Sequence, residues 1–185
     1  MDDSVIIEST RRWIANVVIG LNLCPFAQRV FVGEKIRYVV SPATEENALL
    51  QDLKLELENL AATSIKTVET TLLIHPNALG NFLDFNDFLE PAETLIESLD
   101  LEGIIQLASF HPHYQFAGTR PDDVENFTNR SPYPMLHLLR EDSITAVADD
   151  PESLNDIPKR NIEVLRGLGA EGIRALLARV AEPEA

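Results

Sequence analysis

The chain has 185 residues, of which 45% are hydrophobic, and its 15 basic and 30 acidic side chains give a formal net charge of −15 at pH 7. A chain of this length can bury one core without disulfide or metal staples, and its composition excludes wholesale disorder, collagen and coiled coils. The negative charge argues against nucleic-acid binding, which depends on Lys and Arg at phosphates. We therefore expect a single globular domain over residues 1–180 and a flexible acidic tail over residues 181–185.

The hydrophobic pattern predicts strands that alternate with helices. Runs rich in β-branched residues predict three strands, over residues 35–40, 67–75 and 103–110. Apolar residues at helical spacing predict helices over residues 4–21, 49–60 and 82–99, a helix start at 134–140, and C-terminal segments at 162–168 and 171–180. Pro25 is expected to end the first helix, Ser41-Pro42 to cap the second, and Gly167 and Gly169 to divide the last two segments.

The connections between the predicted strands are long enough for parallel crossovers. We therefore predict an α/β fold with three or more strands in a parallel or mixed sheet, helices packed on the sheet, and a helical C-terminal extension. A ferredoxin-like α+β arrangement with one further strand is the alternative.

The N-terminus, Met1 to Ser4, is acidic where a secretory signal needs positive charge, and no apolar run approaches the roughly 18 residues of a membrane helix. The single cysteine, Cys24, allows no internal disulfide. These features predict a cytoplasmic protein that acts on neither membranes nor nucleic acids. The sequence leaves the oligomeric state open.

Residues that carry chemistry concentrate after the third predicted strand. His111, His113 and His137 fall there, and His75 ends the second predicted strand at the same edge of the sheet. Ligands of open α/β sheets bind beyond the carboxyl ends of the strands. Location and composition therefore both point to a site at this edge.

A metal site is one chemistry that these residues predict. His111 and His113 would project to one side of an extended segment, and His137 would share a helix face with Glu141. Together, His111, His113 and His137, with a carboxylate or Cys24, would suit zinc or another divalent transition metal as cofactor.

Nucleophilic catalysis is a second possibility, with Cys24 as nucleophile, His111 or His113 as base, and Asn129 as the group that orients the base. Free cysteine is also among the most buried residue types, so the alternative is that Cys24 is a small core residue.

Anion recognition is a third possibility. Arg120 and Arg130, with Arg140 nearby, could present planar guanidinium groups to a carboxylate or phosphate, and Tyr114 and Asn129 would complete the substrate-binding set. The alternative is that each arginine pairs with an adjacent acid on the surface, where such pairs contribute little to stability.

Three stretches mark a family resemblance: GLNLCPFA at 20–27, FHPHYQF at 110–116 and NRSPYPMLHLLRE at 129–141. Over residues 13–154 the chain resembles a bacterial family of about this length that is classed as a domain of unknown function. The resemblance implies that the three stretches belong together, and it implies no activity and no catalytic residues.

These observations favour a small enzyme, a metal- or His/Cys-dependent hydrolase, that acts on a small anionic molecule. The competing hypothesis is a non-catalytic binding or adaptor domain that uses the acidic surface between Glu69 and Glu102, a region without Lys or Arg. Convergence of at least three of His111, His113, His137 and Cys24 on a cleft with an arginine would favour the enzyme. Separate packing environments for these residues would count against it.

Overall fold

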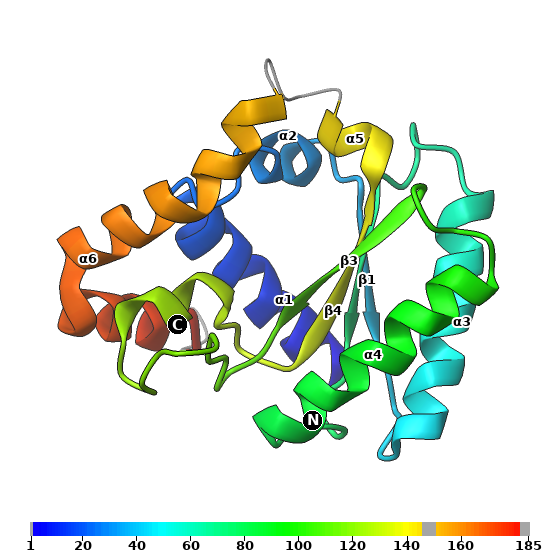
Figure 1. The fold of residues 1–185 in the computed structure, drawn as a ribbon, viewed down its shortest axis with the longest axis horizontal. Helices are drawn as coiled ribbons and strands as arrows, with labels where there is room; N and C mark the ends of the chain where they lie inside the picture. Colours follow the sequence, from blue (N-terminus) through cyan, green and yellow to red (C-terminus); the bar gives the residue numbers. More distant parts are fainter. Residues whose placement is uncertain (1, 146–150, 182–185) are drawn as a thin grey trace.

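The computed structural model describes residues 2–145 and 151–181, and in it a four-stranded sheet lies between two layers of helices (Figure 1). The strands are β1 (Ile36–Val40), β2 (Thr70–Ile74), β3 (Ile105–Phe110) and β4 (Met135–Arg140). They lie in the order β1-β2-β4-β3, with β1 parallel to β2, and β4 antiparallel to both of its neighbours. The predicted α/β class with a mixed sheet is confirmed.

Helices occupy both connections between the parallel strands and both ends of the chain. The α-helices are α1 (Asp3–Trp13), α2 (Ala27–Val32), α3 (Glu46–Ala62), α4 (Phe82–Ser98), α5 (Glu141–Thr145) and α6 (Pro151–Ala181). A π-helical segment, η1 (Ile14–Ile19), continues α1, and a 3₁₀ helix, η2 (Val124–Asn129), lies between β3 and β4. No helix within the described residues is long and apolar enough to cross a membrane.

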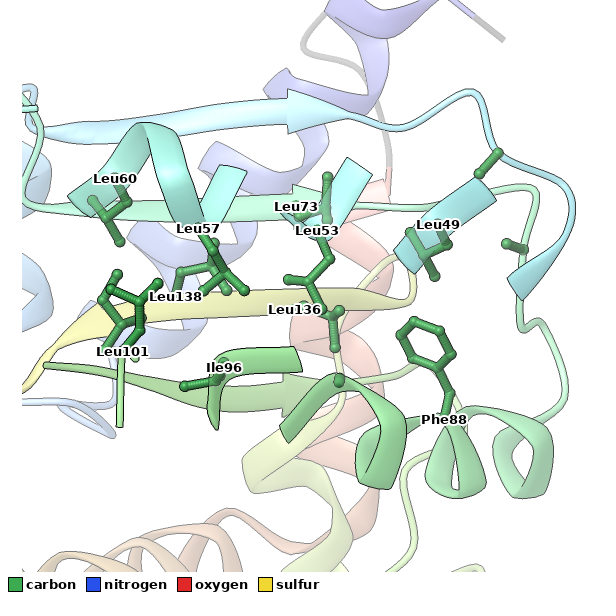
Figure 2. Packing of buried hydrophobic residues seen from close by; sticks show 14 of the residues in the cluster. Leu49, Leu53, Leu57, Leu60, Leu73, Phe88, Ile96, Leu101, Leu136 and Leu138 are labelled. Atoms are coloured by element: carbon green, nitrogen blue, oxygen red, sulfur yellow. The ribbon is translucent and has the colours of Figure 1, made fainter. Parts of the chain in front are cut away.

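The leucine stripe of α3 forms the core on one face of the sheet (Figure 2). Leu49, Leu53 and Leu57 are fully buried against strand residues such as Leu136 and Leu138. Complete burial of a leucine side chain is worth roughly 1.5–3 kcal/mol. The α3/α4 layer is therefore held mainly by the apolar spacing that the sequence displays.

The opposite face of the sheet is covered by α1, η1 and the end of α6. Trp13 and Val17 pack there against Leu72 and Met135, and Val180 joins the same cluster. The predicted division of the C-terminal helices is confirmed at Gly169, where a φ of 68° breaks α6. Such a φ favours glycine, because a Cβ would be strained in this region.

Two sequence predictions are wrong. Residues 135–140 form the strand β4, not the start of a helix, so His137 and Glu141 do not share a helix face. A short apolar run such as MLHLL suits a buried strand as well as a helix. It forms a strand here because β2 and β3 provide backbone hydrogen-bond partners on both of its sides. Ser41 does not cap α3, which begins at Glu46, because its hydroxyl accepts from the Ala43 amide and donates to Asp52.

The predicted acidic tail begins at Ala181, which ends α6, and its residues 182–185 lie outside the described residues.

Candidate functional site

His75 and His111 lie at the same edge of the sheet, as expected. They follow β2 and β3 directly, and both rings pack against Phe85 of α4, with ring centroids 5.7 and 5.1 Å from that of Phe85. Both side chains are fully buried. The two histidines therefore belong to the α3/α4 face of the sheet.

The hydrogen bonds of these two histidines fix their tautomers. Nδ1 of His111 accepts from the His113 amide at 2.9 Å, so Nε2 carries the proton and donates to the Leu79 carbonyl at 3.1 Å. His75 donates from Nδ1 to the Ala78 carbonyl at 3.1 Å, and its Nε2 is buried without a partner in the described part of the chain. Burial lowers the pKa of His111, and it lowers the pKa of His75 to about 4. Both rings are neutral at pH 7 and hold the loops that follow β2 and β3.

His137 lies on the other face of the sheet. Its strand neighbours Leu136 and Leu138 belong to the α3/α4 core, so the imidazole points toward the α1/α6 layer, where it lies near Phe110. Nε2 is 2.7 Å from the hydroxyl of Thr70, which itself donates to a main-chain carbonyl, so Nε2 is the donor. Burial lowers the pKa of His137 to about 4.

The predicted metal ligands are therefore not brought together. His111 and His113 are neighbours, with ring centroids 5.8 Å apart, but His137 is on the opposite face of the sheet. Among the described residues, no group of three or more His, Cys, Asp or Glu side chains is placed to hold a metal ion.

Cys24 lies toward the end of the sheet opposite to His75 and His111. It lies before α2, which leads into the amino end of β1, whereas His75 and His111 follow the carboxyl ends of strands that run in the same direction. Burial raises the pKa of its thiol, which disfavours the reactive thiolate. Asn129, the residue predicted to orient the histidine base, instead donates to the Ser109 carbonyl. The geometric condition set for a His/Cys enzyme is not met by these residues.

The three arginines have three different environments. Arg120 is exposed and pairs with Asp123 at 3.3 Å, as in the surface alternative. Arg140 donates from Nη2 to the carbonyls of Leu60 and Thr63, both at 2.6 Å, at the C-terminal end of α3. This position suits a cation, because the carbonyls at the end of a helix lack intrahelical partners.

Arg130 is half-buried and is held by groups that carry no charge. Its Nε donates to the Tyr114 carbonyl at 3.2 Å, its Nη2 donates to the Pro121 carbonyl at 2.6 Å, and its guanidinium carbon lies 4.3 Å from the ring centroid of Phe127. Tyr114 thus contributes its main chain to this environment, while its ring packs on Phe82. Burial lowers the pKa of Arg130.

The acids near Arg130 are engaged by other arginines. Three carboxylates of the loop before Arg130 form ion pairs elsewhere: Asp122 with Arg174, Asp123 with Arg120, and Glu125 with Arg166. Within residues 2–145 and 151–181, no carboxylate forms an ion pair with Arg130. Two of its five N–H donors are used by carbonyls, and within the described residues the other three have no protein acceptor.

A pocket of about 250 Å³ lies beside Arg130, between α1, the segment entering β4 and the end of α6. Its polar lining consists of Ser9, Arg12, Arg130, Ser131 and Tyr133. Its apolar lining consists of Val5, Pro112, Pro132, Leu177 and Val180. The pocket thus joins two of the recognisable stretches, FHPHYQF and NRSPYPMLHLLRE, to a face of α1.

Arg12 is the second cation of this pocket. Its Nε donates to the Val180 carbonyl at 3.2 Å, and its Nη1 lies 3.8 Å from a carboxylate oxygen of the exposed Glu8. The next residue, Trp13, donates from its indole to the Arg130 carbonyl at 3.0 Å. The two arginines of the pocket are therefore connected through one hydrogen bond.

The contribution of α1 to the site was not predicted from the sequence. Val5, Ser9 and Arg12 follow an i, i+4, i+7 spacing and therefore share one face of the helix, next to the apolar stripe through Ile6 and Trp13. The two polar residues on this face, Ser9 and Arg12, were the feature of the sequence that could have indicated it. Only the tertiary structure shows that this face meets the segment around Arg130.

The geometry defines a three-layer α/β domain with an arginine-lined pocket beside the carboxyl edge of its sheet. The chain belongs to the family described as protein of unknown function (DUF1415), whose model matches residues 5–175. The matched region includes every residue that lines the pocket except Leu177 and Val180. No curated protein and no solved structure matches the chain.

Proposed function

We propose that this domain binds a small anionic molecule, of the carboxylate or phosphate class, in the pocket between Arg12 and Arg130. The observation that carries the proposal is the environment of Arg130. In a chain with a net charge of −15, this half-buried guanidinium is held by two carbonyls and an aromatic ring while the nearby acids pair with other arginines.

Several properties of the pocket support an anionic ligand. Partial burial reduces the screening of the arginine charge by water, so an anion in the pocket is attracted more strongly than an anion at the surface. The carbonyls of Tyr114 and Pro121 fix the plane of the Arg130 guanidinium, which favours paired hydrogen bonds to two oxygens of one ligand. A volume of about 250 Å³ suits a phosphate or a short carboxylic acid.

The proposal assigns binding and no catalytic role. His111, His113 and Cys24, the residues predicted to be catalytic, do not line the pocket. Of the residues predicted to bind substrate, Arg130 lines it, and Tyr114 positions Arg130 through its carbonyl. Asn129 bonds to Thr128 and to Ser109 of β3, and Arg120 bonds to Asp123 of its own loop.

The test is calorimetric titration of the protein with inorganic phosphate, succinate and citrate at low ionic strength. We expect saturable binding of at least one of these anions, a loss of at least about tenfold in affinity for Arg130→Gln, and a smaller loss for Arg12→Gln. Arg120→Gln is the matched control, because it removes the same charge from the same segment outside the pocket. Circular dichroism establishes that each variant is folded.

Two results would overturn the proposal. The first is the absence of saturable binding of all three anions by the unmodified chain. The second is an equal loss of affinity in Arg120→Gln and Arg130→Gln, which would show a general effect of charge.

A further inference from the structure

The helices α3 and α4 lie on the side of the sheet opposite the α1/α6 layer (Figure 1). An open groove runs between these two helices. It has a volume of about 470 Å³ and is lined by Leu50, Glu90, Pro91, Thr94, Leu95 and Ser98. Leu50 and Leu95 are half-buried, and Pro91 is exposed between them along the groove. The floor of the groove is therefore apolar and partly open to solvent.

The surface around this groove carries negative charge without counter-ions. No Lys or Arg occurs between Thr67 and Thr119. The exposed acids of α4 and the following turn are Asp84, Asp87, Glu90, Glu93, Glu97, Asp100 and Glu102. In the part of the chain that the structure describes, none of them forms an ion pair with a Lys or Arg. Lys54, on the facing helix α3, pairs instead with Glu58 at 3.9 Å.

One of these acids lines the groove, and others lie near it on the same helix. Glu90 lines the groove, and Glu97 lies seven residues later on the same face of α4. Burial and the neighbouring Glu97 raise the pKa of Glu93, so the carboxylates of this helix repel one another. A cation that docks beside them would relieve this repulsion.

Pro91, which lines the groove, lies inside α4. Proline has no amide hydrogen, so the Asp87 carbonyl, four residues earlier in α4, receives no helical hydrogen bond from it. The groove therefore offers an apolar floor and, at Glu90, an acidic rim.

We propose that the groove between α3 and α4 docks a short cationic amphipathic helix of a partner protein. Apolar side chains of that helix would lie on Leu50, Pro91 and Leu95, and its Lys or Arg side chains would face Glu90 and Glu97. The stretch from Glu90 to Ser98 spans about 12 Å, which corresponds to about two helical turns of contact. This site is separate from the arginine pocket, so either proposal can fail without the other.

The test uses a fluorescein-labelled 14-residue peptide of Lys and Leu at amphipathic helical spacing, and a reference peptide in which Glu replaces every Lys. Fluorescence anisotropy with the full chain should show that the Lys peptide binds at least about tenfold more tightly than the Glu peptide. Glu90→Lys should weaken binding of the Lys peptide at least about fivefold. Glu102→Lys makes the same change of charge on an exposed residue outside the groove, and it should weaken binding less than about twofold.

Three results would overturn the proposal. They are failure of the Lys peptide to bind, equal binding of the two peptides, and equal weakening by Glu90→Lys and Glu102→Lys, which would show only long-range attraction to an acidic protein. Both substitutions lie on exposed positions, so the variants are expected to fold.

Discussion

The indole nitrogen of Trp13 donates a hydrogen bond to the carbonyl oxygen of Arg130, at a distance of 3.0 Å across 117 positions of sequence. The same ring packs edge-to-face against Phe110, with centroids 5.3 Å apart. Because Arg12 precedes Trp13, this bond ties the end of α1 that carries Arg12 to the main chain of Arg130. The separation of the two arginines across the proposed anion site therefore depends on a buried tryptophan.

Removal of this bond should weaken both the fold and the pocket. We expect Trp13→Phe to lower the free energy of unfolding by about 1–3 kcal/mol, because it leaves the Arg130 carbonyl without its donor. Affinity for the anion identified by titration should also fall. Urea unfolding followed by circular dichroism gives the stability. Phe110→Leu is the control, since it removes the ring contact and keeps the hydrogen bond, and it should leave the affinity within about twofold.

Stability should decrease when the pH falls from about 6.5 toward 4. Burial lowers the pKa of both His75 and His137 from 6.5 to about 4, so the folded state favours the neutral rings and unfolding takes up protons in this range. The stabilisation that comes from keeping these two rings neutral is fully present above pH 6.5. Below pH 6.5, each histidine lowers the free energy of unfolding by up to about 1.4 kcal/mol per pH unit. Urea titrations between pH 7 and 4.5 measure the slope. His137→Gln should make it shallower, and an unchanged slope would exclude this origin.

The thiol of Cys24 should react slowly in the folded protein. Burial raises its pKa, so the thiolate fraction is small near neutral pH. We expect its reaction with a disulfide reagent at pH 7.5 to be at least about tenfold slower than in the urea-unfolded chain. A native rate equal to or above the unfolded rate would restore Cys24 as a candidate nucleophile.

Arg140 and Arg120 should differ sharply in their effect on stability. Arg140→Met removes the charged donor at the end of α3 and should cost about 1.5–3 kcal/mol. Arg120→Met removes an exposed partner of Asp123 and should leave the unfolding midpoint unchanged within error. Equal midpoints for the two variants in urea would contradict the role assigned to Arg140.

Much of the fold could be predicted from local patterns. The strands β1, β2 and β3 and the helices α1, α3 and α4 all correspond to predicted segments, and the break at Gly169 was also expected. The helices α1, α3 and α4 have apolar spacings that match their buried stripes, whereas β2 is buried on both faces and was recognised by its β-branched residues. The order of strands and motifs also predicted Arg130 as a binding residue, and it placed His75 and His111 at the same edge of the sheet.

The strand β4 and the composition of the pocket depend on tertiary structure. The run MLHLL carries no period that separates strand from helix, and it becomes a strand because β2 and β3 supply hydrogen-bond partners on both sides. That insertion places His137 and His111 on opposite faces of the sheet, so these two predicted metal ligands are not brought together. Arg12 and Arg130 line one pocket because segments far apart in the chain pack together. The spacing of residues in the sequence carries information only about neighbours within one element, so it could not predict this pairing.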